Sequence, residues 1–119
     1  MKILNKNLIF FLPNFTKGGA GYAILRLCKY LQNKNFSLNV ICIGKCELKK
    51  DLTNYKVKVY EINSKSTFAS IPKLKKITKE IVYSKPFKTI FISNHHYANV
   101  ISMIALKKIQ IKKILIERT

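Results

Sequence analysis

The order of apolar segments constrains this 119-residue chain most strongly, because short apolar runs alternate with stretches of helical periodicity. Leu8 to Leu12 form the first continuous apolar run and are followed by Pro13 and Asn14, as expected of a strand buried on both faces. From Ala20 to Leu31 the apolar residues recur at helical spacing, which predicts a helix packed on a sheet. The alternation predicts an α/β protein.

The rest of the chain continues this alternation. We predict strands at residues 38–43, 57–62, 89–93 and 114–116, and further helices that begin near Ser70 and after Asn94. A polar loop, without a helix, is expected between the second and third strands, so the direction of the third strand stays open. The predicted fold is a Rossmann-like, three-layer α/β domain with a mainly parallel five-stranded sheet. Its length suits one domain over residues 1–119.

The charge of the chain is strongly basic, with 23 Lys and Arg against 5 Asp and Glu, or +18. Such an excess favours anionic partners, among them acidic lipid, nucleic acid and phosphorylated substrates. The lysines are spread along the whole chain, so a solvated surface with no dedicated partner is an equal alternative. Nucleic acid is the least expected partner, because no motif for its recognition accompanies the charge.

The cysteines and the apolar segments indicate where the chain resides. Cys28 and Cys42 lie inside apolar runs, and no histidine stands at ligand spacing from Cys42 and Cys46, so we expect neither a zinc site nor another metal or cofactor. No segment has the pattern of a signal peptide or the length of a membrane span. We therefore expect a cytoplasmic protein, at most peripheral at the inner face of the membrane.

Three glycines, Gly18, Gly19 and Gly21, stand between the first strand and the first helix. Glycines at this position let the backbone approach a ligand and expose the N–H groups of the helix to an anion. The motif is neither a dinucleotide fingerprint, since Ile24 replaces its last small residue, nor a P-loop. The alternative is a tight turn that needs positive φ. We favour a ligand-facing loop, because it lies near the switch point between the first and fourth strands.

Polar residues also follow the fourth and fifth strands. After the fourth come Asn94, His95 and His96, and after the fifth comes Arg118. A histidine there can act as a base, bind phosphate or hydrogen-bond a sugar hydroxyl, and an arginine suits phosphate or carboxylate. The alternatives are helix capping for the first group and an ordinary salt bridge for Arg118. Hydrolytic chemistry is not expected, since no catalytic triad and no paired carboxylates are evident.

These segments together resemble the N-terminal lobe of GT-B glycosyltransferases, most closely the group-1, family-4 retaining enzymes. The similarity extends over essentially the whole chain. It is carried by Leu8–Pro13, Gly18-Gly19-Ala20, Leu27–Leu31, Leu38–Ile41, Phe91–Asn94 and Ile114–Thr119. The resemblance implies sugar transfer from a nucleotide-sugar donor to a glycan or lipid-linked acceptor, as in cell-envelope polysaccharide biosynthesis. A stand-alone Rossmann-like module for a nucleotide or phosphorylated metabolite is the alternative.

The resemblance also implies roles for particular residues. Gly18 and Gly19 would lie against the donor diphosphate and the transferred sugar, and Asn94 and His95 would line the acceptor side. His95 is then the candidate catalytic residue, and His96 and Arg118 are candidate binding residues.

The chain departs from the family in three places. Gly21-Tyr22 stands where many relatives have Glu-Arg, and Arg118 stands where many have His. The paired glutamates of the C-terminal, donor-binding lobe have no counterpart. We therefore expect residues 1–119 to be one lobe of a longer or split enzyme, inactive by itself.

Overall fold

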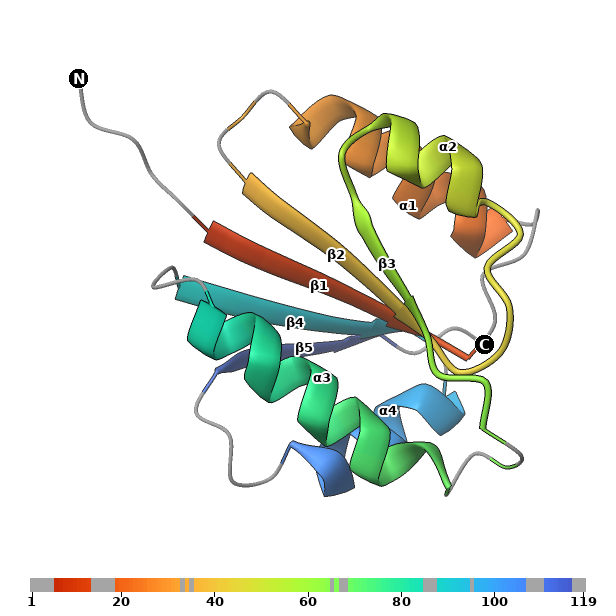
Figure 1. Cartoon of the computed structure of the whole chain (residues 1–119), viewed down its shortest axis with the longest axis vertical. Coiled ribbons are helices and arrows are strands. Elements are labelled where there is room, and N and C mark those ends of the chain that lie inside the picture. Colours follow the sequence, from red (N-terminus) through yellow and green to blue (C-terminus); the bar gives the residue numbers. More distant parts are fainter. Residues whose placement is uncertain are drawn as a thin grey trace.

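The computed structural model describes residues 6–13, 19–32, 34, 36–64, 66, 69–84, 88–94, 96–106 and 111–116. Strands and helices alternate along these residues (Figure 1). The elements are β1 (Lys6–Leu12), α1 (Gly19–Leu31), β2 (Phe36–Cys42), α2 (Lys49–Asn54), β3 (Lys58–Glu61), α3 (Ser70–Ser84), β4 (Lys88–Asn94), α4 (His96–Ala105) and β5 (Lys112–Ile116). Each predicted strand lies within two residues of the observed one at either end.

The strands form one sheet in the order β3-β2-β1-β4-β5, and every neighbouring pair is parallel. The predicted fold class is therefore confirmed. The direction of the third strand, left open by the sequence, is parallel to β2.

The expectation of a loop without a helix between the second and third strands was wrong, because α2 lies there. Leu48 and Leu52, four residues apart, are fully buried and fasten this short helix to the sheet. The residues around them, Lys49, Lys50 and Asp51, are exposed. Leu52 is the one apolar residue of this six-residue helix and Leu48 immediately precedes it, which is too little to produce a recognisable periodicity.

The sheet lies between two layers of helices, with α1 and α2 on one face and α3 and α4 on the other (Figure 1). Successive residues of β1 point to opposite faces, so Phe10 joins the core beneath α1 and α2 while Phe11 joins the core beneath α3 and α4. Because both faces of the sheet are covered, the sequence of the central strand is a continuous apolar run and does not alternate between apolar and polar residues.

The helices are amphipathic. In α1, Ile24 and Cys28 are buried, whereas the side chain of Tyr30 on the outer face is 67% exposed. In α3, Leu74 and Ile81 are buried in the same manner. Within the described part of the chain, no helix combines the length and the hydrophobicity needed to cross a bilayer.

A buried amide network joins the central strands between the amino end of β1 and the middle of β2. Asn7 of β1 donates from Nδ2 to the carbonyl of Ile81 in the last turn of α3 (3.3 Å) and to Oγ1 of Thr89 in β4 (3.5 Å). Asn39 of β2 donates from Nδ2 to Asn7 Oδ1 (3.4 Å) and to the carbonyl of Leu8 (3.2 Å). The network thus joins three adjacent strands and occupies one of the carbonyls that a helix end leaves without an intrahelical partner.

Candidate functional site

The carboxyl ends of the central strands β1 and β4 form the candidate site. These strands are neighbours, with Phe11 of β1 opposite Ser93 of β4. The helices that follow them, α1 and α4, begin at this end of the sheet and lie on opposite faces (Figure 1). This is the switch point at which open α/β sheets bind ligands, as predicted. The first N–H groups of a helix have no intrahelical acceptor, so a helix start can bind an anion.

Gly19 is the first residue of α1 and is exposed. Its φ is not positive, so the backbone here does not require glycine. A Cβ added to it would meet no heavy atom of the described residues within 4 Å. Among the described residues, neither the backbone conformation nor packing explains a glycine at this position. Gly18 lies outside the described residues.

Of the other predicted site residues, some lie within the described part of the chain and some lie outside it. Asn94 ends β4 and His96 begins α4, so their backbones lie at the same sheet edge as Gly19. His95 and Arg118 lie outside the described residues. The structure thus brings together the backbones of Gly19, Asn94 and His96.

Ser93 is a polar group at the switch point to which no role was assigned from the sequence. It is fully buried beside the end of β1, and its Oγ has no hydrogen-bond partner within the described part of the chain. Two further polar residues of α4, Asn99 and Ser102, are buried as well and do have partners. A buried hydroxyl without a partner is costly. The sequence signal was a serine that closes an otherwise apolar run.

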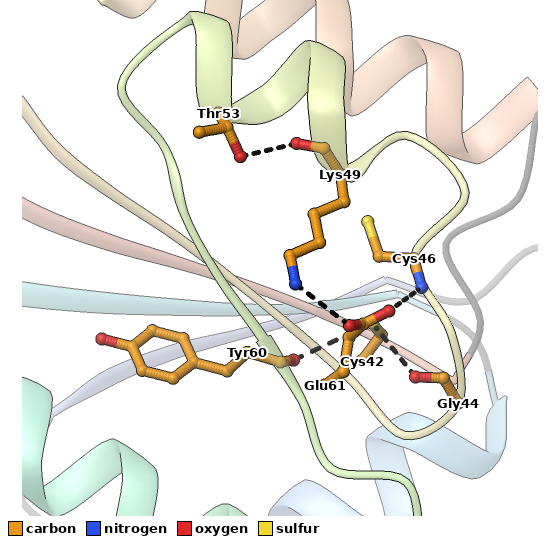
Figure 2. A network of polar contacts seen from close by, with 7 residues as sticks. All are labelled: Cys42, Gly44, Cys46, Lys49, Thr53, Tyr60 and Glu61. Carbon is orange, nitrogen blue, oxygen red and sulfur yellow. Dashed lines mark hydrogen bonds and ion pairs between the residues drawn. The ribbon is translucent and has the colours of Figure 1, made fainter.

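A second polar cluster lies at the carboxyl ends of β2 and β3, where Glu61 is the central residue (Figure 2). The amide of Cys46 donates to Glu61 Oε2 (2.8 Å), and Lys49 Nζ lies 3.4 Å from Oε1. The Cys46 hydrogen bond, followed by the Lys49 ammonium, lowers the pKa of Glu61 below its ordinary value of 4.5. Sequence analysis missed this cluster, because its members become neighbours only through α2 and the parallel pairing of β2 with β3.

The two regions of the edge are connected by the backbone. The carbonyl of Pro13, where the chain leaves β1, accepts hydrogen bonds from the amides of Ile43 (3.0 Å) and Gly44 (2.9 Å). The turn after β2 therefore fixes the start of the segment that leads to Gly19. In the described residues, no group of three His, Cys, Asp or Glu side chains is arranged to hold a metal ion.

Comparison of the sequence with models of known protein families gave no match, and comparison with curated proteins gave no match either. The fold and the residues at the carboxyl edge are therefore the basis for assigning a function.

Proposed function

We propose that this domain is the N-terminal, acceptor-side lobe of a GT-B glycosyltransferase, which moves a sugar from a nucleotide-sugar donor to a glycan or lipid-linked acceptor. The observation that supports this most directly is the open start of α1 at the switch point, where Gly19 leaves room beside the first N–H groups. A diphosphate there would accept hydrogen bonds from these groups and would be stabilised by the helix dipole.

The residues at the edge then have separate tasks. Amides of Gly18 and Gly19 would stabilise the charge that develops on the leaving diphosphate, as donors fixed in position before the reaction. Asn94, His95 and His96, after β4, would line the acceptor side, with His95 as the candidate catalytic residue. Arg118, after β5, would bind a phosphate or a carboxylate.

The charge of +18 supports two further partners in this proposal. A basic surface raises the local concentration of phosphate-bearing substrates. It also favours peripheral contact with an anionic membrane, where a lipid-linked acceptor would lie. On α1, the exposed side chains include Arg26, Lys29 and Tyr30, a combination suited to a membrane interface.

A stand-alone module that binds a nucleotide or a phosphorylated metabolite is the second candidate. The parallel sheet with a helix start at its switch point supports it equally, because unrelated functions share this architecture. The two candidates differ in affinity, since a GT-B ligand is held between two lobes and a single lobe offers one wall.

A nuclear magnetic resonance titration of the 119-residue chain with UDP-, GDP- and ADP-sugars separates them. We expect dissociation constants near 1 mM, or about 4 kcal/mol, and no transfer or hydrolysis. The amide signals of Gly19 and of residues 94–96 should shift, while that of Asn7 at the other end of the sheet should not. Micromolar binding would favour the stand-alone module, and absence of shifts at this edge would contradict both candidates.

Substitution of Gly19 tests the contact itself. Gly19→Asp places a carboxylate where the diphosphate would bind, so we expect the shifts at this edge to vanish through charge repulsion. Gly19→Ala is the matched control, because the Cβ has room and carries no charge. We expect it to retain most of the binding. Equal binding by the folded Asp variant and the wild type would remove Gly19 from the site.

A further inference from the structure

Two cysteines, Cys42 and Cys46, are adjacent to the same glutamate at the carboxyl end of β2. Cys42 ends β2 and lies opposite Glu61 in the register with β3. The chain then bends at Ile43 and Gly44 and returns, so that the amide of Cys46 donates to Glu61 Oε2 at 2.8 Å (Figure 2). Both side chains belong to the core cluster beneath α1 and α2.

The environments of the two thiols are unequal. Cys42 is fully buried, and its Sγ lies within donating distance of two carbonyls, those of Gly44 (3.6 Å) and Tyr60 (3.8 Å). Cys46 is 7% exposed, between the exposed residues Lys45 and Glu47. The inner thiol is therefore held as a hydrogen-bond donor, while Cys46, which is also buried, lies nearer to the surface.

Hydrogen bonding between the thiols sharpens this difference. It raises the pKa of Cys42, together with burial, and it is the main cause that lowers the pKa of Cys46, aided by the backbone of Leu48. Cys28, the third cysteine, shows the effect of burial alone, which raises its pKa to about 12. The thiolate, and not the thiol, is the nucleophile in exchange with disulfides.

We propose that Cys46 and Cys42 form a reversible dithiol–disulfide site that is oxidised by small-molecule disulfides such as glutathione disulfide. The Cys46 thiolate attacks one sulfur of glutathione disulfide, forms a mixed disulfide and releases one glutathione thiolate, which takes up a proton. The Cys42 thiol then attacks Cys46 Sγ while its proton passes to the departing glutathione thiolate, which leaves as the second glutathione. Two cysteine thiols are oxidised and one disulfide is reduced to two thiols. This inference does not depend on the proposed function.

The sequence supplies a direct assay, because Lys45 lies between the two cysteines. Trypsin separates them into peptides 35–45 and 46–49 when both thiols are free, and a disulfide keeps these peptides joined. After the folded chain is incubated with glutathione disulfide and the free thiols are blocked, mass spectrometry of the digest should show the joined pair. Reduction with dithiothreitol should restore the two separate peptides.

Three variants assign the roles. In Cys42→Ala, we expect Cys46 to accumulate as the mixed disulfide with glutathione, because the second step is removed. In Cys46→Ala, Cys42 should remain free. Cys28→Ala is the matched control, also a fully buried thiol of the same core cluster, and should form the joined peptides as the wild type does. In native alkylation of the wild type, Cys46 should react about tenfold faster than Cys28, or more.

Digests of the wild type test the formation of the Cys42–Cys46 disulfide even if a variant fails to fold. Absence of the joined peptides, or a disulfide that includes Cys28, would overturn the proposal. So would alkylation of Cys28 and Cys46 at equal rates in the folded chain.

Discussion

The two ends of the same sheet use polar groups in opposite ways. Toward the amino end, the amides of Asn7 and Asn39 are buried, and among the described residues they bond to strands and to the last turn of α3. At the carboxyl end, polar groups lie at helix starts and in turns, and Glu61 pairs with Lys49 where both are partly exposed. The difference indicates that buried amides join the strands toward the amino end, while Glu61 and Lys49 at the carboxyl end stay partly exposed to solvent.

The physical basis of this division is the geometry of parallel strands. All strands of this sheet run in the same direction, so the starts of α1 and α4 are found at one end alone. Helix starts supply N–H groups without acceptors. At the other end the chain enters the strands, and a buried amide there must be satisfied within the fold or it costs stability.

The largest expected effect comes from breaking the amino end. Asn39→Ala removes the hydrogen bonds that Asn39 Nδ2 donates to two buried acceptors, Asn7 Oδ1 and the carbonyl of Leu8. We expect the free energy of unfolding to fall by about 2–3 kcal/mol, measured by urea denaturation monitored by circular dichroism. Asn54→Ala, at the exposed end of α2, is the control, with an expected change within about 0.5 kcal/mol. Equal effects would mean that the amide network does not hold the strands.

A smaller, pH-dependent effect is expected at the carboxyl end. The folded-state pKa of Glu61 is lowered, chiefly by the Cys46 amide, so its carboxylate stabilises the fold fully above pH 4.5, and this contribution is lost as the pH falls through the lowered value. The wild type should therefore be more stable than Glu61→Gln at pH 7, and the gap should narrow on acidification. Urea unfolding of both proteins at pH 7, 5 and 3.5 measures this difference in the free energy of unfolding. Asp51→Asn, in the first turn of α2, matches the change of charge. If the difference in stability between the wild type and Asp51→Asn decreases on acidification by the same amount, the effect arises from net charge and not from the contacts of Glu61.

The smallest effect is expected from Lys49→Met. The Lys49 side chain is 57% exposed, and its nitrogen lies 3.4 Å from Glu61, so water screens the pair and the stem can still pack. We expect the free energy of unfolding to change by about 0.5 kcal/mol or less, and the change to disappear at 1 M salt. A decrease of more than about 1.5 kcal/mol in the free energy of unfolding would mean that Lys49 stabilises the fold as strongly as the buried amides do. The two ends of the sheet would then not differ in this respect.

The sequence allowed the central architecture to be predicted, because burial on both faces leaves continuous apolar strands such as Leu8–Leu12. The switch point followed from the strand order. The sequence did not reveal α2, which is anchored by Leu48 and Leu52. Nor did it reveal the contact of Cys46 with Glu61, because these residues are 15 positions apart and meet through the pairing of β2 with β3. Asn7 and Asn39 interrupt apolar runs, yet a polar residue in a strand does not reveal its partner. The roles assigned to Gly18, His95 and Arg118 remain predictions.

The carbonyl of Pro13 has a consequence for how the carboxyl edge can move. It accepts hydrogen bonds from the amides of both Ile43 and Gly44. The turn that leads to Cys46 is therefore held to the exit from β1 through one oxygen atom. A displacement of residues 43–46 must either carry Pro13 with it or break two hydrogen bonds together. We therefore expect the exit from β1 and the turn at residues 43–46 to move together, so that a strain applied at the cysteine turn is transmitted to Pro13 at the end of β1.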